Sequence, residues 1–142
     1  MRLFLDTSVL LAASGSVKGA SREVFRLAPA NGWALVATAY VVEEVLRNLP
    51  ELPLAASADW VRLRSDLLVM DDVLTLDRPA VFPVVKDRPI LFSALAWADA
   101  LLTHDRDDFV ELLGREFYGL SILTPGAFLE RERSAGRMKW PK

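Results

Sequence analysis

The 142-residue chain contains no cysteine and only one histidine, His104. It therefore has no disulfide framework and no thiolate zinc site, and it cannot build a cluster of histidine ligands. Any metal site must use oxygen ligands, which suit hard cations such as Mg²⁺ and Mn²⁺. A metal-dependent function in this chain is thus restricted to carboxylate chemistry.

Glycine and long apolar runs are also scarce. Seven residues are glycine and 52% are hydrophobic, which is enough for one domain with a sizeable core. No window has the length and apolarity of a membrane span. The first residues loosely resemble a secretory signal, but Asp6 interrupts their apolar part. We therefore expect a soluble, cytoplasmic protein that does not contact a membrane.

The chain has no large excess of charge of one sign, because its net charge is −2. Residues 131–142 nevertheless carry five basic residues and one acidic residue, a balance of +4, which leaves −6 for residues 1–130. A basic end of this kind is compatible with tracking a phosphate backbone or with a solvated terminus. We divide the chain into a domain of residues 1–133 and a basic tail of residues 134–142.

The apolar periodicity predicts strands and helices in alternation. Strands are expected near residues 2–5, 33–37, 67–70, 98–103 and 120–123. Helices are expected from Ser8 and near residues 20–29, 39–49, 55–66, 87–97, 106–113 and 125–133. The stretch 71–86, with two prolines, reads as irregular. This alternation predicts an α/β fold with βαβ units, right-handed crossovers and a mostly parallel sheet.

Acidic residues recur where these elements meet. Asp6 follows the first strand, Asp105 follows the strand ending at Thr103, and Asp87 opens a helix. In open α/β sheets, residues at the carboxyl ends of strands converge on one crevice. Glu44 lies about one and a half turns into the helix after the second strand, where its longer side chain can reach the same crevice.

Each of these aspartates can instead be a helix cap, because Asp accepts hydrogen bonds from the free amides of a first turn. Several carboxylates at one edge of a sheet, however, repel one another and raise one another's pKa. A bound cation relieves that repulsion. The grouping therefore favours a metal site over three independent caps.

Four segments resemble the four signature blocks of the PIN domain family, in the family's order and approximate spacing. They are LFLDTSVL at 3–10, VEEVL at 42–46, KDRPILFSAL at 86–95 and LLTHDRDDF at 101–109. The resemblance implies a Rossmann-like three-layer α/β/α sandwich and a Mg²⁺ or Mn²⁺ site. It also implies endoribonuclease activity like that of VapC toxins of type II toxin–antitoxin pairs, with RNA as substrate, a homodimer and a cognate antitoxin.

The family pattern assigns roles to positions of this chain. Asp6 matches the first metal-site aspartate, Glu44 the site glutamate, Asp87 the third acid and Asp105 the fourth. Helical phase leaves Glu43 open as the alternative to Glu44. The resemblance implies catalytic roles for these four residues and metal ligation by Asp6, Asp87 and Asp105.

Further positions complete the implied site. Asp108 resembles an outer metal ligand, and Ser8 and Thr103 resemble hydroxyls that orient carboxylates or the attacking water. Asp107 is expected to face solvent, and His104 to be a loop residue rather than a base. The chemistry that fits is metal-assisted hydrolysis of a phosphodiester. Arg88 and Arg106 beside the site are then candidates for binding the RNA backbone, or for pairing with neighbouring acids.

Other functions fit the chain less well. A phosphoaspartate hydrolase would usually place a second aspartate two residues after the first, where this chain has Ser8, and the acid pattern of a receiver domain is also absent. A PIN-like RNA-binding or protein-binding module without turnover stays open. The apolar face around Trp60 in the helix of residues 55–66 is compatible with a docking surface or, as we expect, with core.

Overall fold

We describe the chain from a computed structural model, in which residues 1–74, 88–107, 109 and 111–142 are placed. The side chain of Arg88 lies outside this description, as do Asp87 and Asp108. In the described part of the chain, no helix is both long enough and apolar enough to cross a membrane.

The central feature is a six-stranded sheet in the order β3-β2-β1-β4-β6-β5. The strands are β1 (Arg2–Leu5), β2 (Ala34–Thr38), β3 (Leu67–Met70), β4 (Ala100–Leu102), β5 (Arg115–Phe117) and β6 (Leu120–Leu123). All neighbouring pairs are parallel except β5 and β6, which are antiparallel. The mostly parallel sheet expected from the alternating pattern is confirmed.

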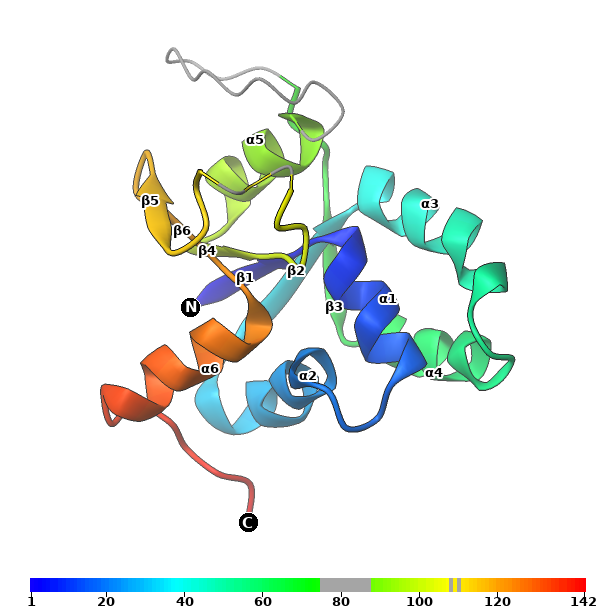
Figure 1. Cartoon of the computed structure of the whole chain (residues 1–142), viewed down its shortest axis with the longest axis horizontal. Coiled ribbons are helices and arrows are strands. Elements are labelled where there is room, and N and C mark those ends of the chain that lie inside the picture. Colours follow the sequence, from blue (N-terminus) through cyan, green and yellow to red (C-terminus); the bar gives the residue numbers. More distant parts are fainter. Residues whose placement is uncertain (75–87, 108, 110) are drawn as a thin grey trace.

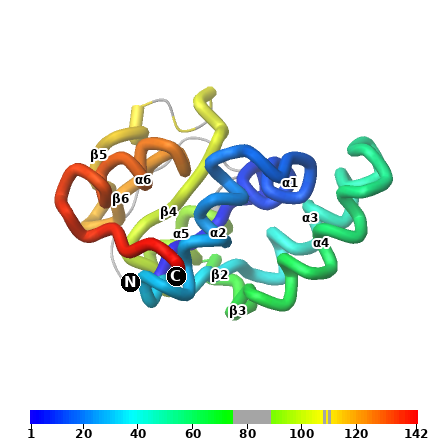
Figure 2. Tube along the Cα trace, turned by 90° about the horizontal axis from the view of Figure 1, so that it is seen from below, coloured from blue at the N-terminus to red at the C-terminus, as the bar shows by residue number. Residues whose placement is uncertain are grey.

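Helices cover both faces of the sheet. They are α1 (Thr7–Gly15), α2 (Ala20–Asn31), α3 (Ala39–Asn48), α4 (Ala55–Arg64), α5 (Arg88–Trp97) and α6 (Pro125–Ser134), with a short 3₁₀ turn η1 (Leu49–Glu51). Helix α5 lies on one side of the sheet, and α2 and α6 lie on the other (Figure 1). Helices α3 and α4 lie at the end away from β5, β6 and α6 (Figure 2). The fold is thus a three-layer α/β/α sandwich, as expected.

Strand β1 forms the centre of the core. Leu3, Phe4 and Leu5 are completely buried, because the sheet is covered on both faces and alternate side chains of one strand enter opposite layers. Trp60 of α4 is also buried, at 5% exposure, so the face around it is core, as we expected. Within α4, Val61 remains exposed.

Two local expectations are wrong. The described residues of the stretch 106–113 form turns rather than a helix, and the amides of Leu112 and Leu113 both donate to the carbonyl of Phe109. Phe109 is completely buried, and Leu112 and Leu113 pack against the same core. Strand β5 was not expected, and it pairs with β6 through the turn at Tyr118 and Gly119.

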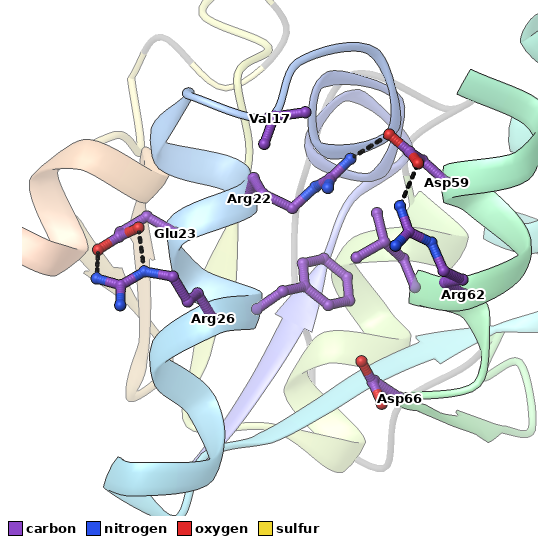
Figure 3. A pocket seen from close by; sticks show the side chains of 9 residues that line it. Val17, Arg22, Glu23, Arg26, Asp59, Arg62 and Asp66 are labelled. Carbon is purple, nitrogen blue, oxygen red and sulfur yellow. Dashed lines mark hydrogen bonds and ion pairs between the residues drawn. The ribbon is translucent and has the colours of Figure 1, made fainter. Parts of the chain in front are cut away.

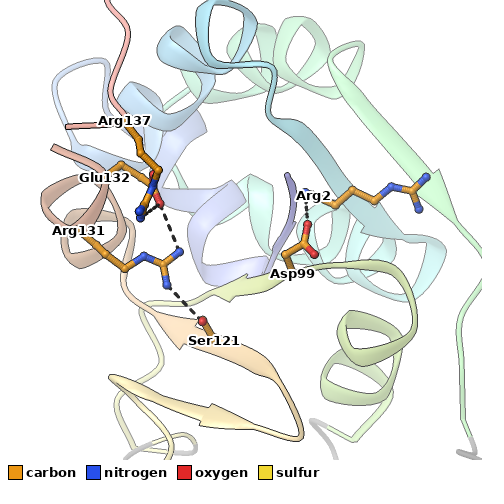
Figure 4. Close-up of polar contacts among 6 residues, drawn as sticks. All are labelled: Arg2, Asp99, Ser121, Arg131, Glu132 and Arg137. Carbon is orange, nitrogen blue, oxygen red and sulfur yellow. Dashed lines mark hydrogen bonds and ion pairs between the residues drawn. The ribbon is translucent and has the colours of Figure 1, made fainter. Parts of the chain in front are cut away.

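The C-terminal residues pack on the domain. The side chain of Asn31, at the end of α2, donates to the carbonyl of Lys139 and accepts from its amide, at 2.8 and 2.7 Å. The carboxylate of Glu132, only 2% exposed, pairs with Arg137 and Arg131 (Figure 4). The Arg137 guanidinium is the main cause that lowers the pKa of Glu132 below 4.5. One of the three basic residues of the tail, Arg137, is therefore already paired.

Candidate active site

A cleft of about 240 Å³ lies where the chain leaves the carboxyl ends of β1, β2 and β4. This edge is where ligands bind in open parallel sheets, because the loops after the strands diverge there. The cleft is lined by Asp6, Thr7, Ser8, Leu11, Tyr40, Glu44, Asn48, Ile90 and Asp105. Three of the residues predicted as acids of the site, Asp6, Glu44 and Asp105, thus face one space.

Asp6 is the buried acid of this cleft, with 5% of its surface exposed. Its position follows from β1, because the completely buried strand ends at Leu5 and the next residue begins the turn into α1. Burial raises the pKa of Asp6 from 3.8 to about 6, with a smaller contribution from the charge of Glu44. Hydrogen bonds from Thr103 and Ser8 offset only part of this effect.

Asp6 occupies the N-cap position of α1 but makes no side-chain capping hydrogen bond. Its backbone carbonyl accepts from the amides of Val9 and Leu10, and its side chain caps no amide of the first turn. The carboxylate is therefore available for a role other than capping. The alternative that Asp6 is simply a helix cap loses its main support.

Two hydroxyl groups hold the Asp6 carboxylate and connect it to the loop after β4. Thr103 Oγ1 donates to Asp6 Oδ2 at 2.6 Å, and Ser8 Oγ donates to the same oxygen at 3.1 Å. Each hydroxyl also accepts a backbone amide: Ser8 from His104 at 3.0 Å, and Thr103 from Asp105 at 3.0 Å. Thr103 is completely buried, so it fixes this arrangement from inside the domain.

Glu44 reaches the cleft from α3. Its Oε1 accepts a hydrogen bond from Thr7 Oγ1 at 3.1 Å, which joins α3 to the first turn of α1. Glu44 is half-buried and lines the cleft, whereas Glu43 is exposed. Asn48, one turn further along α3, also lines the cleft, and its side-chain amide donates to the carbonyl of Glu44. The structure therefore places Glu44, rather than Glu43, against the cleft.

Of the other residues predicted for the site, some line the cleft or lie beside it, and others lie outside the described residues. Asp105 lines the cleft, and Arg106 and Asp107 beside it are exposed. Asp87 and Asp108 lie outside the described residues, so their predicted roles stay predictions. Within the described ranges, no three Asp, Glu or His side chains come close enough together to hold a metal ion.

The oxygen atoms that line the cleft are of the kind that bind divalent cations. The cleft offers carboxylate, hydroxyl and amide oxygens and no sulfur, which matches the preference of Mg²⁺ and Mn²⁺. The carboxylate of Asp6 is held at one oxygen by hydroxyl groups while burial opposes its charge. A bound cation would compensate that charge, so the residues fit a hard divalent cation.

His104 lies beside this site and was assigned no function from the sequence. Its Nε2 is 2.7 Å from Ser21 Oγ, at the first turn of α2. Burial, together with the nearby charge of Arg106, lowers the pKa of His104 below 6.5, so the ring is neutral at neutral pH.

A second, larger pocket of about 370 Å³ lies between α2 and α4 (Figure 3). Its charged residues balance: three arginines face three acids, and Asp59 takes a hydrogen bond from both Arg22 and Arg62. Arg26 pairs with Glu23 in the same way. Because its guanidinium groups are already paired, this pocket offers less to a phosphate than its arginines suggest. We therefore place the candidate active site in the smaller cleft.

Sequence reasoning missed several residues that line or support the cleft. Thr7 and Asn48 contact Glu44, and Tyr40 and Leu11 complete the wall. The spacing of Asn48 four residues after Glu44 was the one signal available, because residues four apart lie on the same helix face. Ser21 and His104 are 83 positions apart in the sequence, so the local sequence pattern could not predict their contact.

Comparison with known proteins gives one result of note. No family model matches the chain, and no curated protein matches it. Among solved structures, it is similar to the crystal structure of Mycobacterium tuberculosis VapC20, described as a sarcin-ricin loop cleaving toxin. The two share 19% sequence identity, the match covers 77% of this chain and 94% of that one, and the TM-score is 0.44.

Proposed function

We propose that this chain is a divalent-metal-dependent endoribonuclease of the PIN type, with its active site in the cleft at Asp6. This proposal is based mainly on the buried carboxylate of Asp6. Burial opposes the charge of this carboxylate, which faces a cleft that Glu44 and Asp105 also line. A domain does not gain stability from such a carboxylate, and strongly perturbed acids of this kind concentrate at functional sites.

Each residue of the site has a definite task in this proposal. Asp6 and Asp105, with Asp87 and Asp108 as predicted from the sequence, would hold Mg²⁺ or Mn²⁺. The bound cation would lower the pKa of a water molecule and offset charge on the phosphate oxygens. Ser8 and Thr103 keep the Asp6 carboxylate in one orientation through hydrogen bonds to Oδ2.

Glu44 holds the opposite wall of the cleft. Its carboxylate accepts from Thr7, so α3 and α1 keep a fixed spacing across the opening. We assign Glu44 to the catalytic group because it is close enough to Asp6 to raise the pKa of that carboxyl.

RNA would be captured mainly by arginines beside the cleft. Arg106 is exposed next to Asp105, and Arg88 begins α5. In α6, Arg131 pairs with Glu132 and Arg133 pairs with Glu130, and Arg137 of the basic tail also pairs with Glu132. An exposed pair such as Arg133–Glu130 contributes little free energy, and the tail also carries the exposed Lys139 and Lys142. We propose a secondary role for residues 134–142 in binding phosphate.

The partners implied by the PIN resemblance belong to the same proposal. We propose that the chain forms a homodimer and that a cognate antitoxin covers the cleft. Light scattering on a size-exclusion column tests the dimer, with a mass near twice 15.8 kDa as the expected result. A short DNA-binding protein encoded next to this chain, able to suppress RNA cleavage when added, would support the antitoxin.

The decisive experiment compares the wild type with Asp6→Asn. Structured RNAs are incubated with each protein in Mn²⁺ and in excess EDTA, and Mn²⁺ binding is measured by calorimetry. Asp66→Asn is the matched control, because Asp66 is an exposed acid at the amino end of β3, the opposite edge of the sheet. We expect cleavage and Mn²⁺ binding in the wild type and the control only. Cleavage that persists in EDTA, or in Asp6→Asn, would overturn the proposal.

One observation favours a second candidate, a PIN-like RNA-binding module without turnover. The described residues contain no group of three acids able to hold a metal ion, so a complete site depends on residues outside them. A module of this kind would bind RNA in a gel-shift assay with the same affinity in EDTA and in Mn²⁺. It would leave the RNA intact under both conditions.

A further inference from the structure

The loop that carries Asp105 is held by one local contact and by contacts with two other segments, α1 and α2. The amide of His104 donates to Ser8 Oγ, and the amide of Asp105 donates to Thr103 Oγ1, both at 3.0 Å. These two contacts link the loop to the residues that hold Asp6. The third contact is made by a side chain: His104 Nε2 lies 2.7 Å from Ser21 Oγ.

The contact between His104 and Ser21 joins the loop to a rigid element. Ser21 lies in the first turn of α2 and is 2% exposed, so its hydroxyl has a fixed position. Helix α2 packs against α1 and α6, which anchors it in the domain. The His104 side chain thus connects the loop to a helix that contributes no residue to the cleft.

We propose that His104 is a positioning residue, which fixes the loop after β4 on α2 and so directs Asp105 into the cleft. The assignment of Asp105 to a metal-binding cleft rests on the proposed function. The need for such an anchor follows from the local structure, because the segment after Asp105 forms turns rather than a helix. Residues that orient ligands in this way commonly change metal affinity 10-fold to 100-fold when removed, on the order seen for outer-shell partners.

A chemical role for the imidazole is the alternative. Nε2, one of the two ring nitrogens that can exchange a proton, is engaged by Ser21 at a distance typical of a good hydrogen bond. The ring is therefore directed toward α2 rather than toward a substrate. A positioning role requires only a hydrogen-bonding atom at the place of Nε2, and the amide of glutamine can supply one.

The experiment compares His104→Ala, His104→Gln, Ser21→Ala and the double alanine variant. His104 is exposed, so its variants should fold, and thermal unfolding checks this. In His104→Ala and Ser21→Ala we expect Mn²⁺ affinity to fall about 10-fold, with a lower kcat and little change in KM for RNA. The double variant should lose no more than either single variant, because both remove one hydrogen bond.

Rescue by glutamine separates positioning from chemistry. We expect His104→Gln to recover most of the Mn²⁺ affinity and most of kcat. A His104→Gln variant as impaired as His104→Ala would show that the imidazole itself acts, and it would overturn the proposal. Additive losses in the double variant, or unchanged affinity in His104→Ala, would do the same.

A second readout does not depend on metal or on cleavage. Hydrogen exchange of the His104 and Asp105 amides, followed by NMR in EDTA, should be faster in His104→Ala and Ser21→Ala than in the wild type. Unchanged exchange would overturn the anchoring role. The two proposals can fail separately. If the wild type neither binds Mn²⁺ nor cleaves RNA, but the variants still exchange faster than the wild type, the proposed function is wrong and the anchoring role of His104 is supported.

Discussion

Replacing Asp6 by asparagine should stabilise the metal-free protein. Burial raises the pKa of Asp6 from 3.8 to about 6, a shift of roughly two units, and each unit corresponds to about 1.4 kcal/mol. The charged carboxylate therefore lowers the free energy of unfolding by about 3 kcal/mol at neutral pH. Asparagine removes the charge, and its carbonyl oxygen can still accept from Thr103 and Ser8.

The sign of the pH dependence is specific. Because the pKa in the folded state lies above its ordinary value, the folded protein binds the proton more tightly than the unfolded chain. The penalty from Asp6 therefore grows as pH rises from about 4 to about 6 and stays constant above that. From this linkage, the stability difference between Asp6→Asn and the wild type should be about 3 kcal/mol near pH 7.5 and about 1 kcal/mol near pH 4.5.

Urea denaturation in excess EDTA measures this difference at both pH values. Asp66→Asn should change the free energy of unfolding by less than about 0.5 kcal/mol, since Asp66 is exposed. Adding Mn²⁺ at 100 times its dissociation constant should then stabilise the wild type by about 2.7 kcal/mol and leave Asp6→Asn unchanged. A variant that is no more stable than the wild type near pH 7.5, or a difference that does not change with pH, would refute the electrostatic reasoning.

Three further outcomes test other parts of the structure. Glu44→Gln should reduce RNA cleavage at least about 100-fold in a fluorescence assay, as for loss of a group acting in proton transfer, whereas Glu43→Gln should leave the rate unchanged because Glu43 is exposed. Phe4→Ala should lower the free energy of unfolding in urea by about 3–5 kcal/mol, because Phe4 is completely buried in the central strand. Glu132→Gln should cost about 1–3 kcal/mol near pH 7, because two guanidinium groups lose their carboxylate. That difference should shrink as pH falls below 4.5, since Arg137 lowers the pKa of Glu132 and the stabilisation is present only while the carboxylate is charged.

The sequence predicted the layers of the fold because the pattern of buried residues is local. The runs at residues 2–5, 67–70 and 120–123 coincide with β1, β3 and β6. Strand order depends on contacts across the chain and could not be derived in this way. Strand β5 was missed because it has three residues and its pairing depends on the turn at Tyr118 and Gly119, both with positive φ.

In the candidate site, too, the features set by local sequence were predicted and those set by long-range contacts were not. Asp6, Glu44 and Asp105 were predicted from their places after strands, and the parallel sheet brings all three to one cleft. The helix expected over residues 106–113 was wrong because apolar spacing alone does not distinguish a helix from turns around one buried phenylalanine, Phe109. The burial of Asp6, which gives the site its electrostatic character, depends on contacts with residues distant in the sequence, such as Thr103.

Helix α2 is fixed at both of its ends. Ser21 in its first turn contacts His104, and Asn31 in its last turn holds the backbone of Lys139. A helix of 12 residues is about 18 Å long. The last residues of the chain are therefore mechanically connected to the loop that carries Asp105. Deleting residues 137–142, or fusing another protein there, should therefore change the Mn²⁺ affinity and the rate of RNA cleavage of the cleft, although these residues do not line it.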